Sequence, residues 1–194
     1  KLVAVTSSVL YSFRIAQYDA NGVLDTSFGD QGVASTTLAA GNPQGAYAVT
    51  TDASGRFVLV GSASYNPAVV RFSAGGALDT AFGKDGAFAT LVQGAGSPQQ
   101  LTAVAVRGDG RIVAAGRANA AAFVLQLDDK GALDASFDGD GWMTVPGEAF
   151  AADQVMILPD GGTLVGGVGG SASPELILLR LGPERARDRD DPVA

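Results

Sequence analysis

The chain has 194 residues, of which 46% are hydrophobic and 27 are glycine, and its net charge is −7. The negative charge argues against a nucleic-acid partner, which would need a basic surface, and no apolar run is long enough to predict membrane insertion. The chain contains neither histidine nor cysteine, which excludes Ser-His-Asp and Cys-His catalysis, the usual zinc sites and disulfides.

Residues 1–6, Lys-Leu-Val-Ala-Val-Thr, predict a strand that recurs along the chain. Its counterparts begin at Arg56 and Arg111, each 55 residues after the previous copy. Because the chain then starts inside a repeat, we expect it to be a processed or truncated product.

A second strand is predicted over residues 13–18, with counterparts at 68–72, 123–127 and 176–181. Polar residues alternate there with apolar ones, which is typical of a half-exposed strand. The polar residues that share one register are Gln17, Arg71, Gln126 and Arg180. A tight turn containing glycine follows each of the first three copies.

An eight-residue segment, Gly-x-Leu-Asp-x-x-Phe-Gly/Asp, comes next and is written three times, over residues 22–29, 76–83 and 131–138. Its aspartates, which we predict to cap a turn by accepting a backbone N–H, are Asp25, Asp79 and Asp134. Its phenylalanines, predicted to plug the end of each repeat, are Phe28, Phe82 and Phe137. We call these segments the aspartate turns.

Each aspartate turn leads into a short strand and then into an apolar hairpin. The hairpins are predicted over residues 47–60, 103–115 and 154–165, with turns rich in Asp and Gly. Such turns between apolar runs are a strong hairpin signal. Continuously apolar strands indicate sheets that are covered on both faces.

Four strands in about 55 residues predict an all-β fold, a β-propeller of four-stranded antiparallel blades. The predicted parts are a half blade at 1–31, blades at about 32–85, 86–140 and 141–181, and a charged tail or linker at 182–194. Closed propellers have about four to eight blades, and an open blade face is prone to association. We therefore expect three and a half blades to be closed by a second copy of the chain or by missing upstream blades.

The repeated motif, followed by a strand and a Gly-Arg hairpin, resembles the delta-sixty repeat, a bacterial β-propeller-like family of unknown function. The resemblance covers residues 1–181. It implies an extracellular or cell-surface location, and it brings no catalytic residues. The chain departs from the pattern at Asp138, where the other copies have glycine, and in the fourth unit, which ends before a Leu-Asp motif.

The densest acidic turn, Asp138-Gly139-Asp140-Gly141, is a candidate calcium site together with Asp134. Calcium prefers six to eight oxygen ligands, which carboxylates and carbonyls in such turns can supply. The alternative is an ordinary structural turn, because the spacing lacks a full EF-hand pattern. No cofactor is otherwise expected.

Two further activities remain as alternatives. Aromatic and amide side chains near strand ends could bind carbohydrate; they are Tyr47, Tyr65, Asn66 and Trp142. A carboxylate pair could hydrolyse glycosides, but the aspartates recur as structural caps do, and nothing marks Glu148 or Glu175 as an acid or base. The sequence favours a non-catalytic structural or interaction module of a secreted or cell-surface bacterial protein, with a protein or glycan partner. The alternative is a calcium-binding or carbohydrate-binding propeller.

Overall fold

The computed structural model describes residues 1–7, 12–38, 44–145, 150–169 and 175–182, which form fourteen strands. The strands are β1 Leu2–Ser7, β2 Phe13–Tyr18, β3 Val33–Thr36, β4 Gln44–Thr51, β5 Phe57–Ala63, β6 Asn66–Phe72, β7 Ala87–Ala89, β8 Gln99–Val106, β9 Ile112–Ala118, β10 Ala121–Leu127, β11 Trp142–Thr144, β12 Phe150–Ile157, β13 Thr163–Gly169 and β14 Glu175–Leu181. These ranges contain no helix, and so none that could cross a membrane. The predicted all-β fold is confirmed. Apart from Gly182, the predicted tail lies outside the described residues.

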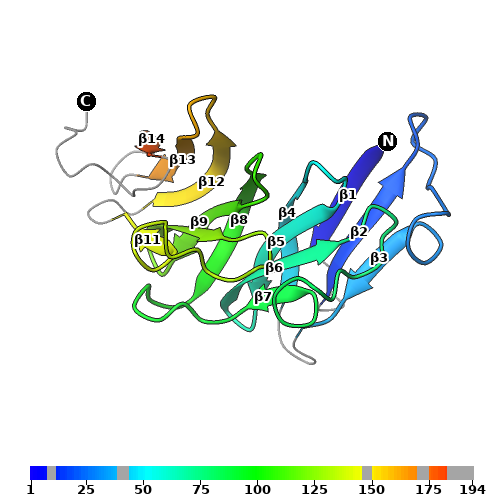
Figure 1. Cartoon of the computed structure of the whole chain (residues 1–194), viewed down its shortest axis with the longest axis horizontal. Coiled ribbons are helices and arrows are strands. Elements are labelled where there is room, and N and C mark those ends of the chain that lie inside the picture. The colour runs from blue at the N-terminus through cyan, green and yellow to red at the C-terminus, as the bar shows by residue number, and fades with distance from the viewer. Residues whose placement is uncertain (8–11, 39–43, 146–149, 170–174, 183–194) are drawn as a thin grey trace.

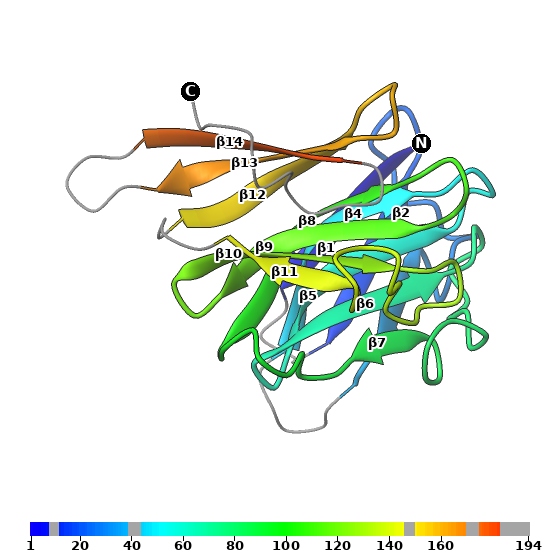
Figure 2. The same cartoon turned by 60° about the vertical axis from the view of Figure 1, so that its left-hand side comes forward.

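The strands form four antiparallel sheets, which we number along the chain: β1–β3, β4–β7, β8–β11 and β12–β14. Figure 1 shows them following one another from the first sheet, in blue, to the fourth, in orange. Figure 2 shows the fourth sheet as the outermost layer, above β8 and β9. Consecutive sheets stack face to face like the blades of a propeller, and the four together form an open arc.

Three hydrophobic cores fill the spaces between consecutive sheets. Ile15 and Leu59 belong to the core between the first and second sheets. Val69 and Leu125 lie between the second and third sheets, and Val124 belongs to the core between the third and fourth. All five side chains are at most 1% exposed. Burying a side chain of this size stabilises a fold by about 1.5–3 kcal/mol, so each sheet depends on its neighbour.

The sheets are offset by one strand from the predicted blades. The strands that open the units predicted at 32, 86 and 141 are β3, β7 and β11, and each pairs with the strand before it. Val33 of β3, for example, pairs with Ala16 of β2. The segment that contains the aspartate turn returns the chain antiparallel to the strand that it just left. The first sheet is therefore three-stranded rather than a half blade, and the fourth ends at β14.

A β-bulge interrupts the hairpin at the inner edge of the second, third and fourth sheets. The bulges lie between Ala46 and Ala48, between Leu101 and Ala103, and between Ala152 and Gln154. Opposite them stand Gly61, Gly116 and Gly167, where a Cβ atom would lie 1.8–2.1 Å from a carbonyl oxygen of the bulged strand. Glycine is required because the two backbones approach too closely for any side chain.

Candidate functional site

The aspartate turns have the same backbone geometry in all three copies. In the second copy, the Asp79 N–H donates to the Arg71 carbonyl at 2.9 Å, and the Phe82 N–H donates to the Asp79 carbonyl at 3.0 Å. The Gly86 N–H then donates to the Phe82 carbonyl at 2.9 Å. The equivalent bonds recur in the first and third copies within 0.1 Å. One local fold is therefore repeated on three successive sheets.

The aspartate carboxylates lie within these turns and accept the N–H two residues further on. The Asp25 Oδ1 accepts the Ser27 N–H at 3.1 Å and the Ser27 hydroxyl at 2.5 Å. Asp134 accepts the same two groups from Ser136, at 3.0 and 2.7 Å. Such Asx turns stabilise a bend that the backbone alone would not hold.

A cation at the start of the sheet's inner hairpin strand reaches each carboxylate. The pairs are Lys1 with Asp25 at 2.7 Å, Arg56 with Asp79 at 3.7 Å, and Arg111 with Asp134 at 2.9 Å. The residue in the shared polar register completes the group. Arg71 Nε donates to Asp79 at 2.7 Å, and Gln126 Nε2 donates to Asp134 at 2.8 Å. The Asp79 and Asp134 carboxylates thus each join three strands or turns of their own sheet, whereas in the first copy Gln17 accepts a hydrogen bond from Lys1 at 3.0 Å.

These contacts lower the pKa of the Asp25 and Asp134 carboxyl groups. Hydrogen bonds from Lys1 and then from Ser27 lower the pKa of Asp25 to about 2. Burial alone would raise the pKa of Asp134, but hydrogen bonds from Ser136 and Gln126 and the charge of Arg111 lower it overall. Both groups are therefore ionised at neutral pH. A general acid needs the opposite shift, a raised pKa.

The depressed pKa values predict acid sensitivity. A carboxyl group whose pKa is lower in the folded chain than in the unfolded chain stabilises the fold at any pH above its unfolded pKa of about 4. This stabilisation is lost as the pH falls through the folded pKa. For Asp25 the folded pKa is about 2. We expect the melting temperature to fall between about pH 4 and 2 and to change little between pH 6 and 8, because the chain has no histidine. Thermal melts across this range check the prediction. An unchanged melting temperature at about pH 2 would contradict it.

The motif phenylalanines lie in the cores between sheets. Phe28, Phe82 and Phe137 are at most 1% exposed. The Phe28 ring meets the Phe57 ring of the second sheet edge-on, with centroids 5.5 Å apart. The Arg71 guanidinium stacks on the Phe82 ring, 4.4 Å from its centroid.

The glycine after each of the first two phenylalanines bonds directly to the next sheet. The Gly29 N–H donates to the Gly75 carbonyl at 2.9 Å, and the Gly83 N–H donates to the Lys130 carbonyl at 2.6 Å. The aspartate turn therefore stabilises its own sheet through its carboxylate and fastens the next sheet through its phenylalanine and glycine.

Arg107 makes a further contact between sheets, which the sequence analysis did not find. Its side chain donates to Gln126 at 3.0 Å in its own sheet, and to Thr163 at 2.8 Å and the Gly161 carbonyl in the fourth sheet. The matching position in the second sheet is Asp52, so no recurrence in the sequence points to Arg107.

The three residues of the predicted calcium site have other roles in the structure. The Asp134 carboxylate is bound by Arg111, Gln126 and Ser136. Asp140 accepts the Trp142 N–H at 3.2 Å, and Asp138 adopts the left-handed conformation, with φ of 54°, that glycine has in the other copies. Within the described ranges, no group of three or more Asp or Glu could hold a metal ion. Calcium binding stays the alternative to a purely structural turn.

A thermal-shift comparison tests the calcium site. We expect calcium to raise the melting temperature no more than magnesium does, because Asp134 already has a cationic partner. The control is Asp140→Asn, which removes one charge but keeps an acceptor for the Trp142 N–H. A shift that is specific for calcium and absent in Asp140→Asn would establish the site.

The candidate carbohydrate-binding residues are spread over several elements. Tyr47 lies at the bulge of β4, Tyr65 in the β5–β6 turn and Asn66 at the start of β6. Trp142 opens β11 and packs on Phe123, with ring centroids 6.2 Å apart. Of the nonrepeated glutamates, Glu175 opens β14, and Glu148 lies outside the described residues.

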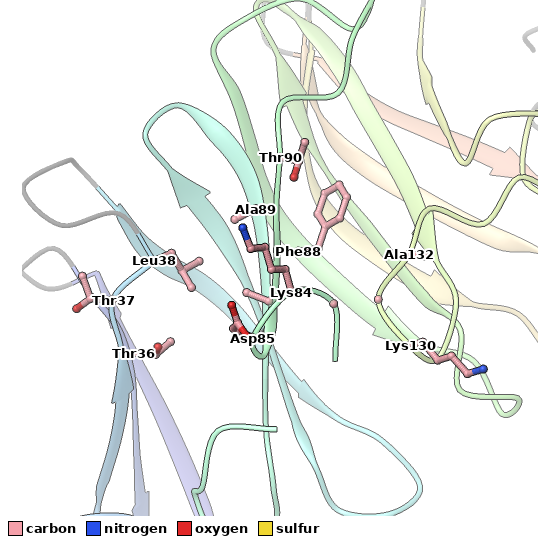
Figure 3. Close-up of a pocket in the computed structure, with 13 residues that line it drawn as sticks. Thr36, Thr37, Leu38, Lys84, Asp85, Phe88, Ala89, Thr90, Lys130 and Ala132 are labelled. Atoms are coloured by element: carbon pink, nitrogen blue, oxygen red, sulfur yellow. The ribbon is translucent and has the colours of Figure 1, made fainter. Parts of the chain in front are cut away.

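The outer rim of the arc contains a cavity of about 850 Å³. The end of β3, residues 83–90 and the turn at 130–132 line it, so it touches the first three sheets (Figure 3). Its charged side chains are Lys84, Asp85 and Lys130, all exposed. No carboxylate pair of the kind needed for acid–base hydrolysis lies in its described lining.

Comparison with known protein families finds one family that is similar to the repeat. Residues 1–28, 53–82 and 107–137 match the model of a family described as "Domain of unknown function (DUF5122) beta-propeller". Each match ends at the phenylalanine of an aspartate turn, Phe28, Phe82 or Phe137. No curated protein matches the chain. The chain is thus a β-propeller domain of unknown function, with three segments that are similar to this family.

Proposed function

We propose that the chain is a non-catalytic structural and interaction module of a secreted or cell-surface bacterial protein, and that it needs no cofactor. One observation carries the proposal: the three recurring carboxylates each bind a cation at the start of a strand of their own sheet. Asp79, for instance, binds both Arg56 and Arg71. The location outside the cytoplasm rests on the resemblance to the delta-sixty repeat.

The pKa values of the aspartate side chains support this role. Hydrolysis by two carboxylates requires one group that holds a proton near neutral pH. The pKa values of Asp25, Asp52, Asp134 and Asp160 are all lowered. Contacts that keep a carboxylate ionised suit an ion pair better than a general acid.

The interaction role follows from the end sheets of the arc. The first and fourth sheets each pack on a neighbour through one face, while apolar side chains on the other face are exposed, such as Leu2 at 59% and Leu176 at 75%. Exposed apolar patches on soluble proteins commonly mark sites of association. A protein partner fits these faces better than a glycan does.

An activity screen with a matched variant tests the proposal. The chain is incubated with a panel of chromogenic glycosides and esters at several pH values, and we expect no turnover above buffer. Asp134→Asn is expected to lower the melting temperature and to have no other effect. Turnover that is lost in Asp134→Asn, or in Glu175→Gln, would make the chain an enzyme and overturn the proposal.

A further inference from the structure

We propose that two copies of this chain close head to tail into a ring, in which the fourth sheet of each copy packs on the first sheet of the other. The inference rests on the interaction role proposed above and names its partner. Its basis is the internal repeat, which shows three times how one sheet covers the next.

The repeat defines two faces on every sheet. The forward face, which contacts the following sheet, carries Val69 of β6 and Val124 of β10; both are fully buried. These residues lie two positions before Arg71 and Gln126 of the shared polar register. In the fourth sheet, the residue two positions before Arg180 is Leu178 of β14. Leu178 therefore occupies the position that a buried core residue occupies in the second and third sheets.

The forward face of the fourth sheet is apolar and exposed. Leu178 is 61% exposed and Leu176 is 75% exposed. Val168 pairs with Leu176 across the strands and is 52% exposed, and Met156 of β12 is 60% exposed. Figure 2 shows this sheet as the outer layer of the arc. Several exposed apolar side chains on one face of a sheet are typical of a surface that another element covers.

The rear face of the first sheet is the matching surface. In the second sheet, the rear residues Phe57, Phe72 and Leu78 pack in the core against the first sheet. Their counterparts in the first sheet are Leu2, Tyr18 and Leu24, of which Leu2 is 59% and Leu24 37% exposed. Small residues, Ala4 and Ala16, pair between them and leave room for an incoming sheet.

Six of the nine large apolar side chains that are exposed in the described residues lie on these two faces. They are Leu2, Leu24, Met156, Val168, Leu176 and Leu178. Exposed apolar surface is thus concentrated at the two ends of the arc, where the repeat predicts contact with another sheet.

A polar contact sets the orientation of the pair. Between the second and third sheets, Arg71 uses Nε to bind Asp79 of its own sheet and Nη1 to donate to the Asp129 carbonyl of the next at 2.7 Å. Arg180 holds the same register position and pairs with Asp160 of its own sheet. The residue that matches Asp129 in the first sheet is Ala20, two residues before the turn glycine. In the ring, Arg180 donates to the Ala20 carbonyl of the other copy.

Two unlike faces on one chain produce a head-to-tail contact, which either closes into a ring or continues as a fibre. Two copies supply eight sheets, within the range of about four to eight blades in which propellers close. We therefore assign the second copy, rather than an open chain of copies, as the partner.

Light scattering after size exclusion tests the ring. Over a concentration series we expect the mass to approach twice the 19.5 kDa of one chain and not to rise beyond it. Leu178→Asp on the forward face, or Ala4→Asp on the rear face, should each give a monomer that still unfolds in one cooperative thermal transition. The control is Tyr65→Asp, which places the same charge at a 63% exposed site away from both faces and should leave the dimer intact.

Mixing the two monomeric variants distinguishes head-to-tail from like-face association. Leu178→Asp has an intact rear face and Ala4→Asp has an intact forward face. An equal mixture of the two variants should therefore form a dimer. A wild-type chain that stays at 19.5 kDa throughout, or a mixture that stays monomeric, would overturn the ring. Neither result bears on catalysis, so the non-catalytic role would stand or fall on the activity screen alone.

Discussion

Replacing Phe82 by alanine is expected to lower the free energy of unfolding by about 3–5 kcal/mol, the usual loss when a buried aromatic side chain is truncated. The ring is fully buried between the second and third sheets. It also supports the Arg71 guanidinium, 4.4 Å from its centroid. Alanine would leave a cavity at the point where the aspartate turn fastens the next sheet. Urea denaturation measures the loss.

Val23→Ala is the control for this prediction. Val23 belongs to an aspartate turn but is 62% exposed, so the change should alter stability by less than about 0.5 kcal/mol. Phe82→Leu keeps much of the side-chain volume and should lower the free energy of unfolding less than Phe82→Ala does. It can still be measured if Phe82→Ala does not fold. If Phe82→Ala and Val23→Ala had equal effects, the phenylalanine would not act as a plug.

Gly116→Ala is expected to be the most damaging of the glycine substitutions in the third sheet. The new Cβ would lie 2.0 Å from the Gln100 carbonyl oxygen and 2.8 Å from the Leu101 Cα. Both are backbone atoms, so relief requires the bulge to move, and overpacking of this kind costs about 1–3 kcal/mol or more. Chemical denaturation measures the effect.

Gly108→Ala provides the matched comparison, because a Cβ there would meet no atom within 4 Å. We expect it to change stability by less than about 1 kcal/mol. A Gly116→Ala chain as stable as Gly108→Ala would show that the bulge does not need glycine.

The repeat made most of the fold predictable. Residues that recur at 54 or 55 positions, such as Asp25, Asp79 and Asp134, revealed the unit, and turn residues placed the hairpins. The grouping of strands into sheets was harder to predict, because the sequence does not indicate which sheet edge a three-residue strand such as β7 will pair with. Its pairing with β6 depends on the direction in which the aspartate turn returns the chain.

The contacts of the candidate site were only partly visible in the sequence. Arg111 and Asp134 each recur at the repeat spacing, but they are 23 positions apart, and only the folded sheet brings them to 2.9 Å. The φ angle of Gly116 is not in the left-handed region, so its conformation does not require glycine. Glycine is required there because of the bulge in the opposite strand. Arg107 contacts another sheet and does not recur, so periodicity could not reveal it.

The four sheets form an arc, and both of its end faces expose apolar side chains of the kind that are buried between sheets. The aspartate turns explain how the sheets are held within the arc, through Phe28 and Phe82 above all. The same packing rule, applied to the exposed Leu176 and Leu178, is the basis of the proposed ring.

Small-angle X-ray scattering of the chain in solution is the most direct test of the proposed ring. A ring should give the forward scattering of two chains, twice 19.5 kDa, and the distance distribution of a compact particle of eight sheets. Leu178→Asp should give the profile of a single arc under the same conditions. A wild-type profile that matches one isolated arc at every concentration would contradict it.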